Sequence, residues 1–217
     1  MQNLRLTPLR LASGILLGSL SFAGAGYAAG IGLGSKDLHA WTQTLTKATC
    51  NQTSTTADDT FVQQALPTST AGGTATTLTI RPTASLQDYA FIRFNLAGCS
   101  LPTTGGADSA VLTVHVTTSG SDTISLFPVT SSWSSSTLNW NGVSGLTIGT
   151  TATGTFSSST TGAKTVTVTA DVDTAIKAGT LWGWELKATS GTATVAIGAA
   201  ENATSGNRPS MTLSDEK

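Results

Sequence analysis

Hydrophobic and polar residues alternate in a series of short stretches from residue 59 onward. Successive side chains of a strand point to opposite faces, so this period of two predicts strands with one buried face. The stretches are Thr77–Arg81, Tyr89–Leu96, Ala110–Val116, Lys164–Thr169, Leu181–Ala188, Val195–Ile197 and Met211–Leu213. Gly, Pro, Ser and Asp residues separate them. Many short alternating strands with turns between them predict an all-β sandwich or barrel.

Some positions within these strands carry a specific expectation. In the stretch Leu181–Ala188, the alternation places Trp182, Trp184 and Leu186 on one face, with Glu185 and Lys187 on the other. One short helix is expected at 171–178, with Asp171 as its N-cap and Gly179 just after its end. No strand–helix–strand rhythm and no internal repeat is present.

The stretch Ile124–Gly142 departs from the alternating pattern. It begins as a strand that Pro128 ends or places at an edge, and a Ser-rich loop with Trp133 and Trp140 follows. Trp140 follows Leu138 by two residues, so we expect both on one face of a short strand and Trp140 to be largely buried. Trp133 has serines on both sides, and we expect it to be partly exposed.

The first 28 residues have the pattern of a secretory leader. Two arginines precede a long charge-free run, and the small residues at 26 and 28 predict cleavage after Ala28. The alternative is an uncleaved membrane anchor, since the run is long enough to span a bilayer. Glycines throughout the run weaken it as a helix and favour cleavage. The protein is therefore expected to be secreted or on the cell surface, with membrane contact only if the leader is uncleaved.

Residues 29–57 form a lead-in before the domain. Leu38, Trp41 and Leu45 share a helical face, although an extended arm that docks Trp41 is an equal alternative. The only two cysteines are Cys50 and Cys99. An even pair in an exported protein predicts a disulfide. Two buried free thiols are the other interpretation.

Composition excludes several classes of function. Charged residues make up 11% of the chain and the net charge is −1, with no basic cluster, so a nucleic-acid partner is not expected. The two histidines, His39 and His115, lie near no nucleophile-elbow pattern, so the sequence argues against serine hydrolysis. Zinc-binding clusters of His and Cys are absent from the sequence.

Six sequence blocks, in order, resemble the DNRLRE-domain family, the group related to family 96 carbohydrate-binding modules. The blocks are 57–62 (ADDTFV), 89–96 (YAFIRFNL), 109–114 (SAVLTV), 127–134 with 139–141 (FPVTSSWS and NWN), 168–172 (VTADV), and 200–202 with 207–213 (AEN and NRPSMTL). The resemblance covers 58–214 and leaves 215–217 as a tail. It implies a jelly-roll-like antiparallel β-sandwich on a secreted bacterial protein. Some relatives bind polysaccharide. This chain carries Ser135 where the family often has an acidic residue.

Two kinds of site are candidates. The aromatic rings of Trp133, Trp140, Trp182 and Tyr89 could stack on sugar rings of a polysaccharide or cell-wall glycan, or could instead be core and end-cap packing. Asp58 and Asp59 begin the first strand of the family domain and Glu201 lies in its last block. They could hold a structural calcium, since calcium takes carboxylate oxygens. A solvated turn with an ion pair from Glu201 to Arg208 is the alternative interpretation.

Three functions follow from these observations, given from the most to the least favoured. The first is a non-catalytic module that binds polysaccharide or cell-wall glycan. The second is a structural or adhesin-type surface protein with no small ligand. The third is a glycoside hydrolase, which would need two carboxylates placed together in a groove.

Overall fold

The computed structural model describes residues 47–52, 57–83, 86–96 and 107–216. The leader with its cleavage point after Ala28, most of the lead-in and residue 99 lie outside the described residues. The secretion and disulfide hypotheses therefore stay predictions. No helix among the described residues is long and apolar enough to cross a membrane.

Eleven strands are described, and every pairing between them is antiparallel. They are β1 (Lys47–Gln52), β2 (Ala57–Gln63), β3 (Thr77–Thr83), β4 (Leu86–Phe94), β5 (Ser109–Thr118), β6 (Thr123–Pro128), β7 (Gly154–Ser157), β8 (Gly162–Thr167), β9 (Trp184–Ser190), β10 (Val195–Gly198) and β11 (Ser210–Glu216). One-turn helices lie at η1 (Ala71–Thr74), α4 (Trp140–Val143) and η3 (Ser205–Asn207). The predicted jelly-roll-like antiparallel β-sandwich is confirmed.

The strands form two layers that share β3. One layer holds β1, β11, β5, β10 and β8, and the other holds β2, β4, β9, β6 and β7. The first part of β3, through Ile80, pairs with β10, and its last part, from Arg81, pairs with β4. The second layer carries the aromatic residues discussed below, and we call it the aromatic sheet.

The main core lies between the layers and is built by the alternation of the strands. Its fully buried side chains include Leu78, Ile80, Ile92, Leu112, Ile124, Leu126, Trp184, Leu186, Ile197 and Met211. Nearly all of these positions were expected to face inward, so the period of two is confirmed. At ~25 cal/mol per Å² of apolar surface removed from water, this cluster is the main source of stability.

The helix α5 (Thr169–Ala178) is present, and Gly179 follows it with φ of +75°, as expected at a helix C-terminus. The predicted N-cap is wrong. The helix begins two residues earlier, after Val168, and Asp171 lies within its first turn. The Asp171 carboxylate instead accepts hydrogen bonds from Trp184 Nε1, at 2.7 Å, and from the hydroxyl of Thr153. This contact ties α5 to the main core.

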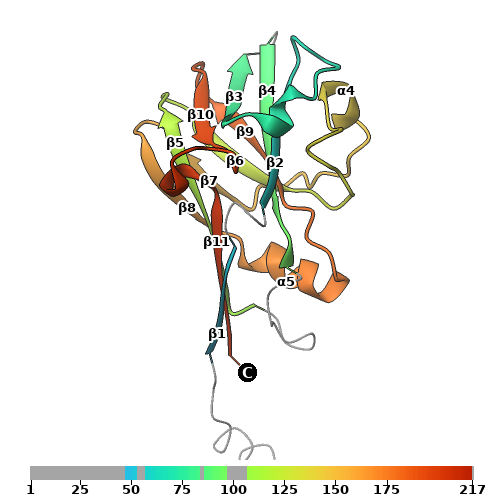
Figure 1. The fold of residues 1–217 in the computed structure, drawn as a ribbon, viewed down its shortest axis with the longest axis vertical. Helices are drawn as coiled ribbons and strands as arrows, with labels where there is room; N and C mark the ends of the chain where they lie inside the picture. Colours follow the sequence, from blue (N-terminus) through green and yellow to red (C-terminus); the bar gives the residue numbers. More distant parts are fainter. Residues whose placement is uncertain (1–46, 53–56, 84–85, 97–106, 217) are drawn as a thin grey trace, which may run out of the picture. The chain divides into compact units, whose positions relative to one another are not determined.

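A second hydrophobic cluster lies on the outer face of the aromatic sheet. Residues 129–148, which we call the covering segment, pack Val129, Trp133 and Leu138 against Val62 and Phe91. In Figure 1 this segment, with α4, lies beside β2 and β4, on the side away from β5, β8 and β10. The sequence predicted a short strand around Leu138 and Trp140. That expectation is wrong, because Asn139 caps the turn of helix α4 with its side-chain oxygen.

Candidate functional site

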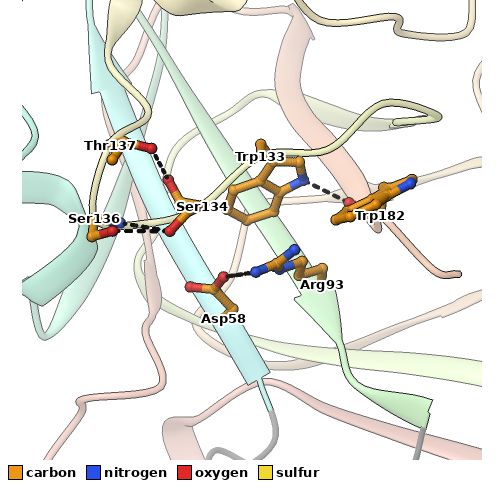
Figure 2. A network of polar contacts seen from close by, with 7 residues as sticks. All are labelled: Asp58, Arg93, Trp133, Ser134, Ser136, Thr137 and Trp182. Carbon is orange, nitrogen blue, oxygen red and sulfur yellow. Dashed lines mark hydrogen bonds and ion pairs between the residues drawn. The ribbon is translucent and has the colours of Figure 1, made fainter.

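Trp133 anchors the covering segment and is not a free binding surface. Its side chain is 7% exposed, and its ring meets Phe91 of β4 edge-on with centroids 5.7 Å apart. Its Nε1 donates a hydrogen bond of 2.6 Å to the backbone oxygen of Trp182 (Figure 2). The predicted exposures are therefore reversed, since Trp133 is buried and Trp140 is only partly buried. The serines next to Trp133 gave no indication that it is buried, because its apolar partners come from the sheet and not from its own loop.

A cation lies against the two indoles. The guanidinium carbon of Arg93 is 5.1 Å from the Trp133 ring centroid and 5.4 Å from that of Trp182. Arg93 Nε also donates to Asp58 Oδ2 at 2.8 Å, across the β2–β4 pairing (Figure 2). A cation over an indole contributes about 0.5–2 kcal/mol, depending on how far it is desolvated. Arg93 therefore fixes the orientation of both rings, a role that the sequence did not indicate.

Trp182 lies on the outer side, although the alternation placed it beside Trp184 on the inner face. Gly183, between them, has φ of +76°, and a Cβ there would come within 1.9 Å of the Ile92 backbone oxygen. This left-handed residue breaks the alternation just before β9 begins. Trp184 is consequently in the main core, whereas Trp182 packs on the outer cluster and stays partly exposed.

Trp182 lines a hollow of about 250 Å³. We call it the Trp182 hollow. Its walls come from Pro128–Thr130, from α5 and from the segment Thr180–Gly183, and are mostly apolar. Polar groups in the walls belong to Thr130, Asp171, Thr174 and Thr180. A partly exposed indole beside hydroxyl and carboxylate oxygens is suited to an amphipathic ring with polar substituents.

Tyr89 forms a second aromatic feature on the same sheet face. Its ring lies 5.0 Å from that of Trp140, centroid to centroid, and both residues are partly buried. Lys187 extends along this face, with its ammonium 4.2 Å from the Phe127 ring centroid and 5.7 Å from that of Tyr89. The ammonium also lies 2.9 Å from the carboxylate of Glu185, which is 2% exposed. Burial, and next the charge of Glu185, raise the pKa of the Tyr89 hydroxyl.

We call Tyr89, Trp140, Phe127, Lys187 and Glu185 the Tyr89 face. Trp140 was among the aromatic candidates for sugar binding, whereas Phe127 and the charged pair were not. Register would have identified them, because Phe127 pairs with Glu185, which pairs with Phe91. The sequence alone gives no register between strands so far apart.

The predicted calcium ligands separate onto two faces of β2. Asp58 faces Arg93, whereas Asp59 points inward, is 2% exposed, and accepts a hydrogen bond of 2.7 Å from the Ala200 amide at Oδ2. Its other oxygen is buried without a hydrogen-bond partner. Burial raises the pKa of Asp59 to about 7; the Ala200 amide opposes this shift, and the neighbouring Glu201 adds to it.

The structure does not bring Asp58 to the other two carboxyl groups. Within the described part of the chain, no three carboxylate, histidine or cysteine side chains gather as a metal site would require. Asp59 and Glu201 remain close together, and oxygen-only donors of this kind suit calcium. Calcium binding by this pair stays a prediction. Arg208, the alternative partner of Glu201, donates its Nε hydrogen to the backbone oxygen of Asn202 at 2.6 Å.

Comparison with known proteins gives a family. The model of carbohydrate-binding module family 96 matches residues 50–215. No match was found among curated proteins. The matched region contains the aromatic sheet, the covering segment and α5.

Proposed function

The chain belongs to carbohydrate-binding module family 96, and on this premise we propose that it is a non-catalytic module that binds polysaccharide outside the cell. The site is the outer face of the aromatic sheet. The observation that carries this proposal is the Tyr89 face, where two partly exposed rings lie beside a lysine–glutamate pair. Binding, and not hydrolysis, is the function that this arrangement supports.

The chemistry of the Tyr89 face matches a sugar chain. A pyranose ring presents apolar C–H groups on its faces and hydroxyls around its edge. The Tyr89 and Trp140 rings offer an apolar surface for the first, and the Lys187 ammonium, held by the buried Glu185, offers donors for the second. The charges of that pair cancel, so the contact depends on stacking and hydrogen bonds more than on long-range attraction.

The neighbouring covering segment holds this face in place. Its residues are tied to the segments that flank the sheet by the Trp133–Trp182 hydrogen bond and by Asn141, whose backbone amide donates to the Pro67 backbone oxygen at 3.1 Å. Trp140, the residue before Asn141, is therefore held beside Tyr89 before any ligand arrives. A ring that is already ordered loses little conformational freedom on binding, which favours affinity.

Export and surface location belong to the same proposal. The leader pattern of residues 1–28 and a surface of Ser, Thr and Asn with few charges support work outside the cell. Cell-wall glycan is one polysaccharide that such a protein would meet. Fractionation of the producing cells, with detection of the protein in medium, wall and membrane fractions, tests the location.

Affinity electrophoresis against a panel of insoluble and soluble polysaccharides, including purified cell wall, tests the function. We expect retardation by at least one glycan, and its loss in Tyr89→Ala. The matched control is His115→Ala, on β5 of the opposite layer, which should bind normally. If no glycan retards the wild-type protein, the structural or adhesin-type function replaces this proposal.

A further inference from the structure

We propose that the Trp182 hollow is a separate subsite, which takes a single uncharged pyranose at the end of a polysaccharide chain. This inference rests on the proposed function, since it specifies how the same sheet face selects its ligand. It concerns different residues from the Tyr89 face and can fail independently of it.

The two features are well separated. Trp182 lies against Arg93, four residues along β4 from Tyr89, which corresponds to about 13 Å at the usual rise of a strand. The buried Trp133 and Phe91 lie between them. One sugar ring therefore cannot contact both Trp182 and Tyr89.

The size of the hollow limits its occupant to one ring. Pockets for drug-sized ligands usually hold about 300–1,000 Å³. The Trp182 hollow holds about 250 Å³ and is lined by α5, Pro128–Thr130 and Thr180–Gly183. This volume suits one pyranose ring, and we take that ring to be a terminal unit, whose single glycosidic link leaves the rest of its edge free to meet the lining residues.

The polar groups of the hollow are mainly acceptors. The Thr174 hydroxyl donates its hydrogen to the Ala170 backbone oxygen at 2.9 Å, and the Thr130 hydroxyl donates to that of Thr147 at 3.3 Å. The oxygens of both side chains remain able to accept. Asp171 adds a carboxylate, held in place by Trp184 and Thr153. Acceptors of this kind suit the hydroxyls of a neutral sugar, whereas a carboxylate or sulfate on the ring would be repelled.

The indole that forms the apolar wall is fixed in advance. The backbone oxygen of Trp182 accepts a hydrogen bond from Trp133 Nε1, and the Arg93 guanidinium lies close to the Trp182 ring (Figure 2). The neighbouring Gly183 has no side chain that could fill the hollow. Its backbone oxygen accepts a hydrogen bond of 2.9 Å from the Val129 backbone amide, which joins the segment Thr180–Gly183 to Pro128–Thr130. The Trp182 hollow is therefore a formed site, with one aromatic wall and a rim of oxygens.

Titration calorimetry with methyl glycosides of glucose, mannose, galactose and glucuronic acid tests the proposal. We expect at least one neutral glycoside to bind, and the glucuronide to bind at least about tenfold more weakly. Trp182→Ala should weaken the binding of the neutral glycoside by about tenfold or more. Ala178→Trp, which fills the hollow from α5 and leaves Trp182 in place, should do the same.

His115→Ala, on β5 of the opposite layer, serves as the matched control and should bind the glycoside like the wild type. For a retained polysaccharide, partial digestion that creates more chain ends should increase the moles of protein bound per gram. Thermal unfolding of each variant verifies that it is folded, and Trp182→Phe provides a milder change if Trp182→Ala is not.

The proposal is overturned if no neutral glycoside binds, or if Trp182→Ala binds it unchanged. Equal binding of the glucuronide would overturn the selectivity for neutral sugars. Polysaccharide binding that is lost in Tyr89→Ala but unaffected by Trp182→Ala and by digestion would leave the proposed function intact and remove only this subsite. Binding of glycosides without any polysaccharide binding would instead reject the proposed function.

Discussion

The two hydrophobic clusters of this domain differ in how they are built. In the main core, each strand contributes every second residue, and Trp184 is fully buried among them. In the outer cluster, one irregular segment is laid over a sheet face, and its margins leave Tyr89, Trp140 and Trp182 partly exposed. Both clusters hold large aromatic side chains, but only the outer one presents them to solvent.

Gly183 separates the two environments. Trp184 and Trp182 stand on either side of it in the chain, yet the Trp184 indole donates to the Asp171 carboxylate of α5, while the Trp182 indole lines an open hollow. The comparison indicates that the main core supplies most of the stability, whereas the outer cluster leaves part of its apolar surface exposed, where we propose that glycan binds. Four substitutions can separate these roles.

The largest effect is expected at the centre of the main core. Trp184→Ala should lower the free energy of unfolding by about 3–5 kcal/mol, because it leaves a cavity and removes the hydrogen-bond donor to Asp171. Chemical denaturation measures this loss. A decrease smaller than that of Trp133→Ala would show that the outer cluster, not the main core, dominates stability.

Trp133→Ala should follow, with a loss of about 3 kcal/mol, the lower end of the range for buried aromatic residues. Trp133 is 7% exposed and packs on Phe91. Trp140→Ala, the matched change in the same segment, should cost less, because Trp140 is only partly buried. Denaturant melts of both variants give the order directly, and a greater loss at Trp140 would contradict the description of Trp133 as the anchor.

Gly183→Ala tests the division between the clusters. A left-handed conformation costs an L residue about 1–2 kcal/mol, and the added Cβ would also approach the Ile92 oxygen. We expect a loss of at least about 2 kcal/mol, together with a shift of Trp182 that weakens glycan binding. The control is Gly179→Ala, which has φ of +75° but open space around it, and should lose stability without affecting binding. Unchanged binding in Gly183→Ala would mean that Trp182 takes no part in recognition.

The smallest effect concerns pH, at a site remote from the rings. Asp59 has a pKa of about 7 in the folded protein against about 3.9 when unfolded, so between these values the folded state holds the extra proton. The free energy of unfolding should therefore fall as pH rises from about 4 to 7. We expect a net decrease on the order of 1–2 kcal/mol, because other carboxyl groups that titrate in this range partly offset the effect of Asp59. Asp59→Asn keeps an acceptor for the Ala200 amide and should flatten this slope in denaturant melts at a series of pH values. The same slope in wild type and variant would assign the pH dependence to another group.

The sequence predicted the main core because its signal is local. Alternation over a few residues was enough to place Leu112, Ile197 and Met211 inward, and Gly179 marked the end of α5. These features depend on neighbours in the chain, which the sequence shows directly.

The outer cluster was not predicted, because its contacts join residues far apart. Trp133 is buried by Phe91 and Arg93, about forty positions earlier in the chain, and its loop shows no periodicity of its own. The alternation also failed at Trp182, where a single left-handed glycine reverses the side of the sheet. Asp171 was taken as a cap because of its position, whereas its partner Trp184 becomes visible only when α5 packs on the core.

The pairing of β1 with β11 has a mechanical consequence. Lys47 stands opposite Glu216 and Gln52 opposite Met211, so the first and last described residues lie side by side at the same end of one ladder. A pulling force applied between these two points would open the ladder from that end, breaking its hydrogen bonds one after another and not all together. The domain should therefore yield at low force by peeling of β1 from β11, while the sheet that carries the aromatic rings stays intact.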